Sequence, residues 1–262
     1  MTDHPKAPAH ILELTLLENS YSFLSEALTK AVAAEMEPGQ WKFAIFNLIQ
    51  AVELSLKEKL AREHRLLVFQ NVDKREQTVN LWGALLRLRD GCELPLSRID
   101  VETIKIAAEW RNQIVHCEFS LNTAELKPAF AKLVGFMADF HERFLDDDLK
   151  EAIPKELWQK AVSVRDYGEE LSRRANETFT REKIHPNNIW PCLKCGWKDF
   201  VIQGQRNKCY VCGHTEPIAM CDGCGKLEYA SQMRIEPDQE PGSHEFDQLC
   251  RECLGSPDYW YS

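Results

Sequence analysis

One short stretch of the chain combines a permanent cation with a titratable ring. It is the run Arg111-Asn112-Gln113-Ile114-Val115-His116, which lies near the end of an apolar helical pattern. Arginine stays charged and can hold a phosphate through two parallel N–H donors. Histidine is the side chain whose ordinary pKa allows proton transfer near neutral pH. This pair of residue types suits the cleavage of RNA without a metal ion.

A regular helix does not bring the two groups onto one face. Arg111 and His116 lie about 140° apart on a helical wheel. Asn112 and His116 are four residues apart and share a face, with Glu109 one turn earlier. Arg111 falls within the apolar arc, where an unpaired arginine is costly. Because Glu53 lies among apolar residues on its own helical wheel, we predict a Glu53–Arg111 ion pair. The apolar arc is formed by Val101, Ile104, Ala107, Ala108, Ile114 and Val115.

A second chemical pattern follows residue 190, where eight of the ten cysteines form four C-x-x-C pairs. The pairs are Cys192/Cys195, Cys209/Cys212, Cys221/Cys224 and Cys250/Cys253. Eight thiolates are enough for two tetrahedral zinc ions per chain, and all-cysteine sites are structural because they leave no coordination position open. Neighbouring pairs grouped in sequence order would make two successive zinc ribbons, which we favour. A crossed grouping is the alternative.

Charge separates the two predicted ribbons. The first carries basic residues with aromatic residues between them, a pattern typical of surfaces that neutralise phosphates and stack unpaired bases. Its candidate RNA-binding residues are Lys194, Trp197, Lys198, Arg206 and Lys208. An ordinary charged surface with structural tryptophans is the alternative. The second ribbon is acidic and is expected to face protein or solvent.

Helices are expected to position the Arg-Asn-His run, because the pattern is helical almost throughout the chain before residue 180. We expect helices over 9–35, 40–64 and 78–89, a motif helix after Ser97, a helix from Asn122 toward Leu149, and a further helix after Pro154. Ser97 with Asp100, and Asn122 with Glu125, have the spacing of N-terminal caps.

Length and composition favour two domains in the chain of 262 residues. We predict an all-α helical bundle over 1–150, a connecting helix over 151–185 that acts as a strut or a dimer contact, and tandem zinc ribbons with short β hairpins over 186–262. The net charge of −9 argues against binding nucleic acid over the whole surface. No apolar run has membrane-spanning length and no signal segment follows Met1, so we expect a cytoplasmic protein. His64 and His141 are expected on helix surfaces.

The spacing Arg-Asn-x-x-x-His, late in a helix of an all-α domain, resembles the ribonuclease motif of the HEPN superfamily. The run from Ala51 to Lys57 also resembles that family, and the resemblance covers roughly residues 9–149. It implies metal-independent RNA cleavage by a homodimer whose two motifs face each other across one cleft. Some members carry tyrosine two residues after the histidine, where this chain has Glu118. Regulation through that tyrosine therefore does not transfer.

The resemblance also implies roles for the residues of the motif. His116 would move the proton of the attacking ribose hydroxyl or of the leaving oxygen. Arg111 would steady the charge of the phosphorane, and Asn112 would orient one of these groups. Glu53 and Glu109 are candidate supporting residues around them.

Two functions follow from these patterns. The first is a homodimeric ribonuclease whose zinc ribbons select or position RNA, an architecture that by resemblance serves as a toxin or in antiviral defence. An antitoxin or a regulatory protein would then be a further partner. The alternative is a non-catalytic dimeric adaptor that binds RNA or protein through its ribbons.

Overall fold

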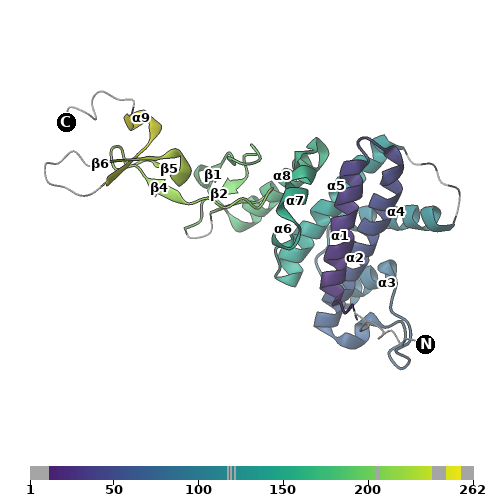
Figure 1. Cartoon of the computed structure of the whole chain (residues 1–262). Coiled ribbons are helices and arrows are strands. Elements are labelled where there is room, and N and C mark those ends of the chain that lie inside the picture. Colours follow the sequence, from purple (N-terminus) through teal and green to yellow (C-terminus); the bar gives the residue numbers. More distant parts are fainter. Residues whose placement is uncertain are drawn as a thin grey trace, which may run out of the picture. The chain divides into compact units, whose positions relative to one another are not determined.

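The computed structural model describes residues 12–116, 118, 120, 122–204, 207–237 and 246–254. It divides into two compact units, Met1–Glu170 and Leu171–Ser262 (Figure 1). The first unit is helical, and the second combines helical segments with short antiparallel strands. At this level the predicted fold class is confirmed. No helix in the described ranges is long and apolar enough to cross a membrane.

The first unit is built around α2. Its α-helices are α1 (Leu16–Ala33), α2 (Trp41–Glu63), α3 (Leu81–Leu86), α4 (Arg98–His116), α5 (Thr123–Phe140), α6 (Leu149–Ala152) and α7 (Lys155–Ser163). α1 packs along α2 (Figure 1), and α2 also contacts α3, α4 and α5. On α2 the apolar residues Ile45, Leu48, Val52 and Leu56 recur at helical spacing and are all buried. α2 is therefore the centre of the core, and α4 is held against it.

Side-chain caps fix the start of α4, which contains the motif, and the start of α5, which follows it. Ser97 Oγ accepts the N–H of Asp100 at 3.1 Å and donates to the Asp100 carboxylate at 2.6 Å, just before α4. Asn122 caps α5 by accepting the N–H of Ala124 at 3.0 Å. Both caps that the spacing predicted are confirmed, because each needs only residues within one turn.

Two other helices begin later than predicted. Residues 12–15 are not helical, and α1 begins at residue 16 because Thr15 and Glu18 form a reciprocal capping box. α3 begins at residue 81, after Asn80, whose side chain accepts the N–H of Gly83 at 2.8 Å. In both cases a side-chain oxygen takes over a backbone donor and sets the first turn.

The single connecting helix predicted over 151–185 is wrong. The chain forms α6, α7 and α8 (Arg165–Glu182) instead. Val164 adopts an extended conformation, with φ −73° and ψ 121°, and its N–H bonds to the carbonyl of Ala161 to end α7. The carbonyl of Val164 then accepts the N–H of Tyr167 and starts α8. A β-branched side chain loses less rotamer freedom in an extended conformation than in a helix, which favours a helix break at Val164.

The described part of the second unit contains small antiparallel sheets. β1 (Ile189–Trp190), β2 (Phe200–Val201) and β3 (Lys208–Cys209) form one sheet in that order, β4 (Ile218–Met220) pairs with β5 (Leu227–Tyr229), and β6 (Arg234–Pro237) pairs with β7 (Phe246–Leu249) before α9 (Arg251–Leu254). The ring of Tyr229 packs edge-on against Phe200 at 5.0 Å, and its hydroxyl donates to the carbonyl of Pro191 at 2.9 Å. One apolar cluster joins Ala175 and Phe179 of α8 to Val201. Cores this small cannot hold such short strands by apolar burial alone.

A buried polar network ties α1 and α2 to the end of α5. His141 is fully buried in a π-helical turn after α5, not on the surface as predicted. Its Nε2 lies 2.8 Å from Ser55 Oγ, and its Nδ1 lies 2.9 Å from Asp147 Oδ2. Tyr21 donates to the same carboxylate oxygen at 2.7 Å. Because Ser55 is also fully buried, this serine–histidine–aspartate series is closed to substrates and acts structurally.

Asp147 gives the network a predictable pH dependence. Hydrogen bonds from His141 and from Tyr21 hold the pKa of Asp147 below the ordinary value of 3.8. A carboxyl whose pKa is lowered in the folded state stabilises the fold above its unfolded pKa, and loses that effect as the pH falls through the folded value. We expect Asp147→Asn to lower the free energy of unfolding at neutral pH by about 1–2 kcal/mol. Below pH 3.8, the free energy of unfolding of the variant should fall less steeply with decreasing pH than that of the natural chain.

Urea unfolding followed by circular dichroism, at neutral pH and below pH 3.8, measures both effects. Asp146→Asn is the matched control, since Asp146 is exposed and its φ of 50° lies in the left-handed region that asparagine tolerates. This control should keep the pH dependence of the natural chain. If the free energy of unfolding fell equally with pH in the natural chain and in Asp147→Asn, the network would not set the pH dependence of stability.

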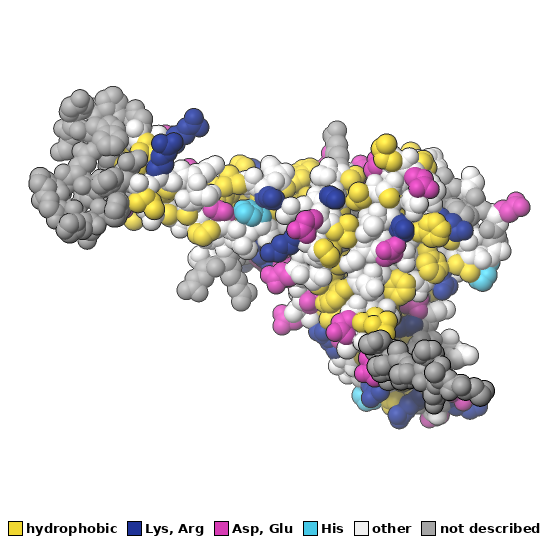
Figure 2. Space-filling model, in the orientation of Figure 1, with side chains coloured by type: hydrophobic (Ala, Val, Ile, Leu, Met, Phe, Trp, Pro, Cys, Tyr) yellow, Lys and Arg dark blue, Asp and Glu magenta, His cyan; other side chains and the backbone are white. Residues whose placement is uncertain are grey.

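Charge on the helical unit is mixed. Figure 2 shows basic and acidic side chains interspersed with hydrophobic ones over the face of the helical unit that it presents. Together with the net charge of −9, this distribution leaves no broad basic surface on that face. Any contact with nucleic acid there has to be local.

Candidate functional site

The candidate catalytic run occupies about the last two turns of α4, which ends at His116. Asn112 and His116 are both exposed on one side of the helix, and Glu109 is exposed one turn earlier. Arg111 is half-buried on the adjoining side. The guanidinium of Arg111 and the imidazole of His116 therefore lie at the same end of one helix, and only the imidazole is fully exposed.

The Glu53–Arg111 ion pair predicted from the helical wheels is wrong. Glu53 instead accepts a hydrogen bond from Lys57 at 2.6 Å, one turn along α2, and Lys57 also donates to Thr78 at 3.0 Å. Arg111 is left with its Nε buried and without a hydrogen-bond partner in the described part of the chain. Its Nη1 approaches Asn112 Oδ1 only at 3.5 Å. The intrahelical lysine reaches Glu53 first because residues four apart are neighbours on a helix.

A hollow of about 90 Å³ opens beside Arg111, between α2, the start of α3, and α4. Its lining residues are Ile49, Glu53, Asn80, Leu81, Trp82, Ala108, Arg111 and Asn112. The sequence patterns did not indicate Asn80 or Trp82 as residues of a site. The position of Asn80 as a helix cap could have been found from the residues that follow it. Trp82 gives no such signal, because its exposed fraction of 37% depends on which helices pack around it.

The apolar face of α4 is confirmed in part. Ile104, Ala107 and Ile114 are buried, but Val115 is 48% exposed. On another side of the helix Ile99 and Ile106, seven residues apart, are 57% and 44% exposed, and Trp110 is half-buried one turn further on. These three residues form one stripe at helical spacing. α4 therefore presents an apolar stripe to solvent in addition to the face packed on α2.

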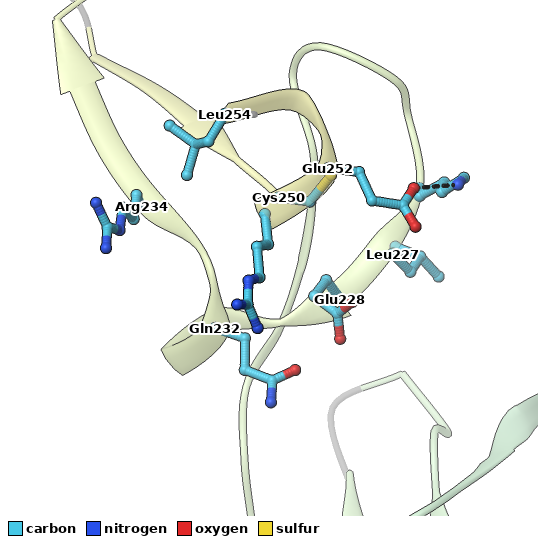
Figure 3. A pocket seen from close by; sticks show the side chains of 9 residues that line it. Leu227, Glu228, Gln232, Arg234, Cys250, Glu252 and Leu254 are labelled. Atoms are coloured by element: carbon cyan, nitrogen blue, oxygen red, sulfur yellow. Dashed lines mark hydrogen bonds and ion pairs between the residues drawn. The ribbon is translucent and has the colours of Figure 1, made fainter. Parts of the chain in front are cut away.

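In the second unit, a groove of about 980 Å³ lies beside β5, β6 and α9. Figure 3 shows its lining side chains, which are Lys226, Leu227, Glu228, Gln232, Arg234, Cys250, Arg251, Glu252 and Leu254. Lys226 pairs with Glu252 at 2.6 Å. Among the described residues, Arg234 and Arg251 have no ion-pair partner. The acidic character expected of this ribbon is therefore interrupted by a groove lined by Arg234 and Arg251.

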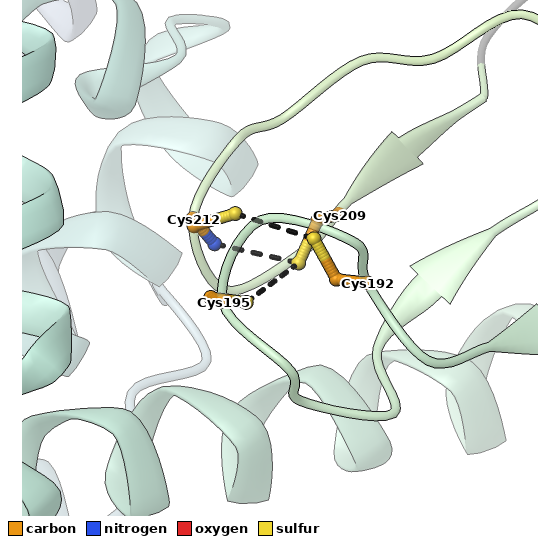
Figure 4. A group of neighbouring side chains, drawn as sticks. All are labelled: Cys192, Cys195, Cys209 and Cys212. Atoms are coloured by element: carbon orange, nitrogen blue, oxygen red, sulfur yellow. Dashed lines mark hydrogen bonds between the residues drawn. The ribbon is translucent and has the colours of Figure 1, made fainter. Parts of the chain in front are cut away.

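The cysteines after residue 190 form two four-residue clusters in sequence order, the first of which is shown in Figure 4, and this confirms the sequential grouping over the crossed one. They are Cys192, Cys195, Cys209 and Cys212, and Cys221, Cys224, Cys250 and Cys253. Within each cluster the sulfurs all lie within 4.8 Å of one another. Sγ separations are 3.6 Å for Cys192–Cys212, 3.7 Å for Cys195–Cys209 and 3.8 Å for Cys224–Cys250.

These separations fit a metal ion and not disulfides. A tetrahedral ion with Zn–S bonds of about 2.3 Å needs sulfurs about 3.8 Å apart. A disulfide holds its two sulfurs at about 2.0 Å. Each cluster could therefore hold one metal ion.

The backbone of the knuckles supports the same geometry. Gly196, Gly213 and Gly225 follow three of the C-x-x-C pairs with φ values of 79°, 74° and 71°, a left-handed conformation that glycine adopts without strain. The N–H of Lys194 bonds to Cys192 Sγ at 3.4 Å. The fourth pair is followed by Leu254 and closes with α9, a helical turn that needs no glycine. Local sequence therefore explains both kinds of knuckle.

Most of the predicted RNA-binding residues can be placed on the first ribbon. Lys194 and Lys198 are exposed, whereas Trp197 is half-buried. Lys208 is half-buried, with its Nζ 5.4 Å from the centroid of the Tyr210 ring. Arg206 lies outside the described residues. Two lysines thus remain open to a ligand, while the aromatic residues are partly used in packing.

Asp199 makes this surface more cationic than the sequence suggests. It is the one acid between Lys183 and Cys212, and it is only 1% exposed. Its Oδ1 lies 3.4 Å from Asn176 Nδ2, and its Oδ2 has no hydrogen-bond partner among the described residues. Burial raises the pKa of this carboxyl. Trp190, by contrast, packs edge-on against a tyrosine at 5.2 Å and has a structural role.

Comparison with known protein families, with curated proteins and with solved structures found no match. The chemistry of this chain is therefore inferred from the types and positions of its own residues. The two relevant features are the Arg-Asn-x-x-x-His run at the end of α4 and the two four-cysteine clusters.

Proposed function

We propose that this chain is a metal-independent endoribonuclease of the HEPN type, with two zinc ribbons that recognise RNA or a protein partner. The observation that carries the proposal is the end of α4, where exposed Asn112 and His116 stand beside Arg111, whose buried Nε has no hydrogen-bond partner among the described residues. A guanidinium can bind a phosphate through parallel N–H donors, and an exposed imidazole beside it can transfer a proton.

The reaction would proceed by attack of the ribose 2′-oxygen on the neighbouring phosphorus. The 2′-oxygen bonds to phosphorus as the bond to the 5′-oxygen breaks, which yields a cyclic phosphate and a free 5′-hydroxyl. One histidine accepts the proton of the 2′-hydroxyl, and a proton donor protonates the leaving oxygen. Arg111 balances the negative charge of the phosphorane. Asn112 orients the phosphate or the ring of His116.

A homodimer would supply the second proton carrier. Each motif contains one histidine, His116, whereas the reaction needs a base and an acid. The stripe of Ile99, Ile106 and Trp110 on α4 offers apolar surface near the motif for a second copy. In this arrangement the acid for one site comes from His116 of the partner.

The two cysteine clusters would hold one structural zinc ion each. Four thiolates leave no open position, so these ions hold the ribbons together and do not take part in cleavage. Lys194 and Lys198 would bind the phosphates of RNA from the first ribbon. The protein would act in the cytoplasm as a toxin or a defence effector, controlled by an antitoxin or a regulatory protein.

The groove of the second ribbon supports a second candidate function. Arg234 and Arg251, which lack ion-pair partners among the described residues, could hold an acidic partner without any catalysis by the helical unit. The chain would then be a dimeric adaptor that binds RNA or protein through its ribbons.

Cleavage of a single-stranded RNA during brief exposure to EDTA separates the two functions. We expect the natural chain to cleave, and Arg111→Ala and His116→Ala to lose most of that activity. Brief exposure removes loosely bound catalytic metal while the four-thiolate zinc stays bound. Equal cleavage by all three proteins would contradict the assigned site, and no cleavage by any of them would favour the adaptor.

A further inference from the structure

The hollow beside Arg111 contains donors that the fold itself does not use. Arg111 Nε is buried without a partner among the described residues. Asn80 Oδ1 accepts the N–H of Gly83 at 2.8 Å, and the amide N–H groups of Asn80 have no partner among the described residues. A buried donor without an acceptor is costly, so an acceptor is expected to fill this space.

Charge in the hollow favours an anion. Glu53 also lines it, but the carboxylate of Glu53 is neutralised by Lys57 at 2.6 Å. Arg111 is therefore the remaining charge. At about 90 Å³ the hollow is too small to enclose a nucleotide, but it suits a single group such as a phosphate.

Trp82 stands at the same hollow with 37% of its surface exposed. Its neighbours in α3, Leu81 and Leu85, are buried and supply the contacts with the core. Packing therefore does not explain a large aromatic ring left open to solvent. Exposed aromatic faces beside cations are how proteins hold unpaired bases.

Gly83 keeps Asn80 in position. A Cβ atom at Gly83 would lie 3.3 Å from Asn80 Oδ1, which is tighter than an ordinary contact. Glycine at this position lets Asn80 cap α3 closely, so that its amide is held at the hollow. The arrangement is thus fixed before any ligand arrives.

We infer that this hollow and Trp82 form a nucleotide subsite for single-stranded RNA. A phosphate binds Arg111 and the amide of Asn80, and the adjoining base stacks on Trp82. The inference deepens the proposed nuclease and rests on it for the choice of ligand. It adds Asn80 and Trp82 as binding residues that determine the preference for unpaired over paired RNA.

The test measures binding without cleavage, in the full-length His116→Ala background. Fluorescence anisotropy compares a labelled single-stranded RNA with the same RNA annealed to its complement. Adding Trp82→Ala should weaken single-strand binding by about 5- to 100-fold, and Trp82→Phe should restore most of it. Phe43→Ala is the matched control, because Phe43 is 48% exposed and does not line the hollow.

Asn80→Asp provides a test that spares the fold. Aspartate keeps the capping oxygen for Gly83 but places a carboxylate where the inference needs a donor. Single-strand binding should fall at least about 10-fold, since like charges would meet in the hollow. Unchanged binding by Asn80→Asp, or equal losses by Trp82→Ala for single-stranded and duplex RNA, would overturn the subsite.

These results are distinguishable from failure of the nuclease itself. If Arg111→Ala and His116→Ala abolish cleavage while Trp82→Ala binds RNA normally, the nuclease stands and the subsite is wrong. If the natural chain cleaves nothing while Trp82→Ala and Asn80→Asp weaken binding, the subsite stands in an RNA-binding adaptor. Absence of RNA binding by every variant would overturn both, and would leave the ribbons as a surface for protein.

Discussion

Replacement of His116 by alanine is expected to lower the rate of RNA cleavage by about 100- to 10,000-fold, the range typical for loss of a general acid or base. The helical unit should stay folded, because His116 is exposed at the last residue of α4. The substitution removes only the favourable placement of a histidine at a helix C-terminus, which is a small contribution to stability. Initial rates on a labelled single-stranded RNA and circular dichroism give the two quantities.

Gln113→Ala is the matched control for this experiment. Gln113 is exposed on the same helix, three residues before His116, and the proposed chemistry does not use it. It should keep nearly full activity. A loss in Gln113→Ala as large as that in His116→Ala would mean that the end of α4 acts as a structural surface. Retention of activity in His116→Ala would remove the histidine from the mechanism.

Removal of metal is expected to unfold the ribbons and to leave the helical unit folded. The strands of the second unit are two to four residues long, and its apolar clusters are small. Binding of a structural zinc ion contributes about 10–16 kcal/mol in small zinc-dependent folds, where it acts as folding free energy. Hydrogen exchange of the full chain, before and after chelation, should show protection lost in the ribbons and kept in α1, α2 and α5.

A single cysteine substitution is expected to remove one metal ion without a chelator. Cys209→Ser should lower the metal content from two ions per chain to one and destabilise the first ribbon, because Cys209 is fully buried within that cluster. Cys92→Ser is the control, since Cys92 is half-buried and belongs to neither cluster. A freshly purified natural chain without metal, or two ions retained by Cys209→Ser, would contradict the zinc assignment.

Features that depend on neighbouring residues were predictable from the sequence. The caps at Ser97 and Asn122 were correct because a cap needs only a side chain and the turn that follows it. The tight turns after three cysteine pairs depend in the same local way on the glycine that follows each pair. The break at Val164 was missed, since the apolar periodicity continues across it and only the extended backbone reveals the end of α7.

Features that depend on contacts between distant elements were not predictable. The wheels placed Arg111 toward the core correctly, but could not show that Lys57 would take Glu53 from it. Asp199 looks like an ordinary surface acid in the sequence and is buried in the fold. His141 looks like a surface residue on a helical pattern, and is buried because Ser55 and Asp147 come to it from elsewhere in the chain.

The sequence by itself determined the helical character of the first unit, the four cysteine pairs, and the residues that we propose act on a phosphate. Each of these follows from residue type and spacing within a short stretch of chain. Only the tertiary structure decided that Arg111 Nε is buried without a hydrogen-bond partner in the described part of the chain, and that Asn80 and Trp82 line the same hollow. The physical reason is that the surroundings of a side chain, and hence its free donors and its exposure, are set by elements that fold against it from distant parts of the sequence.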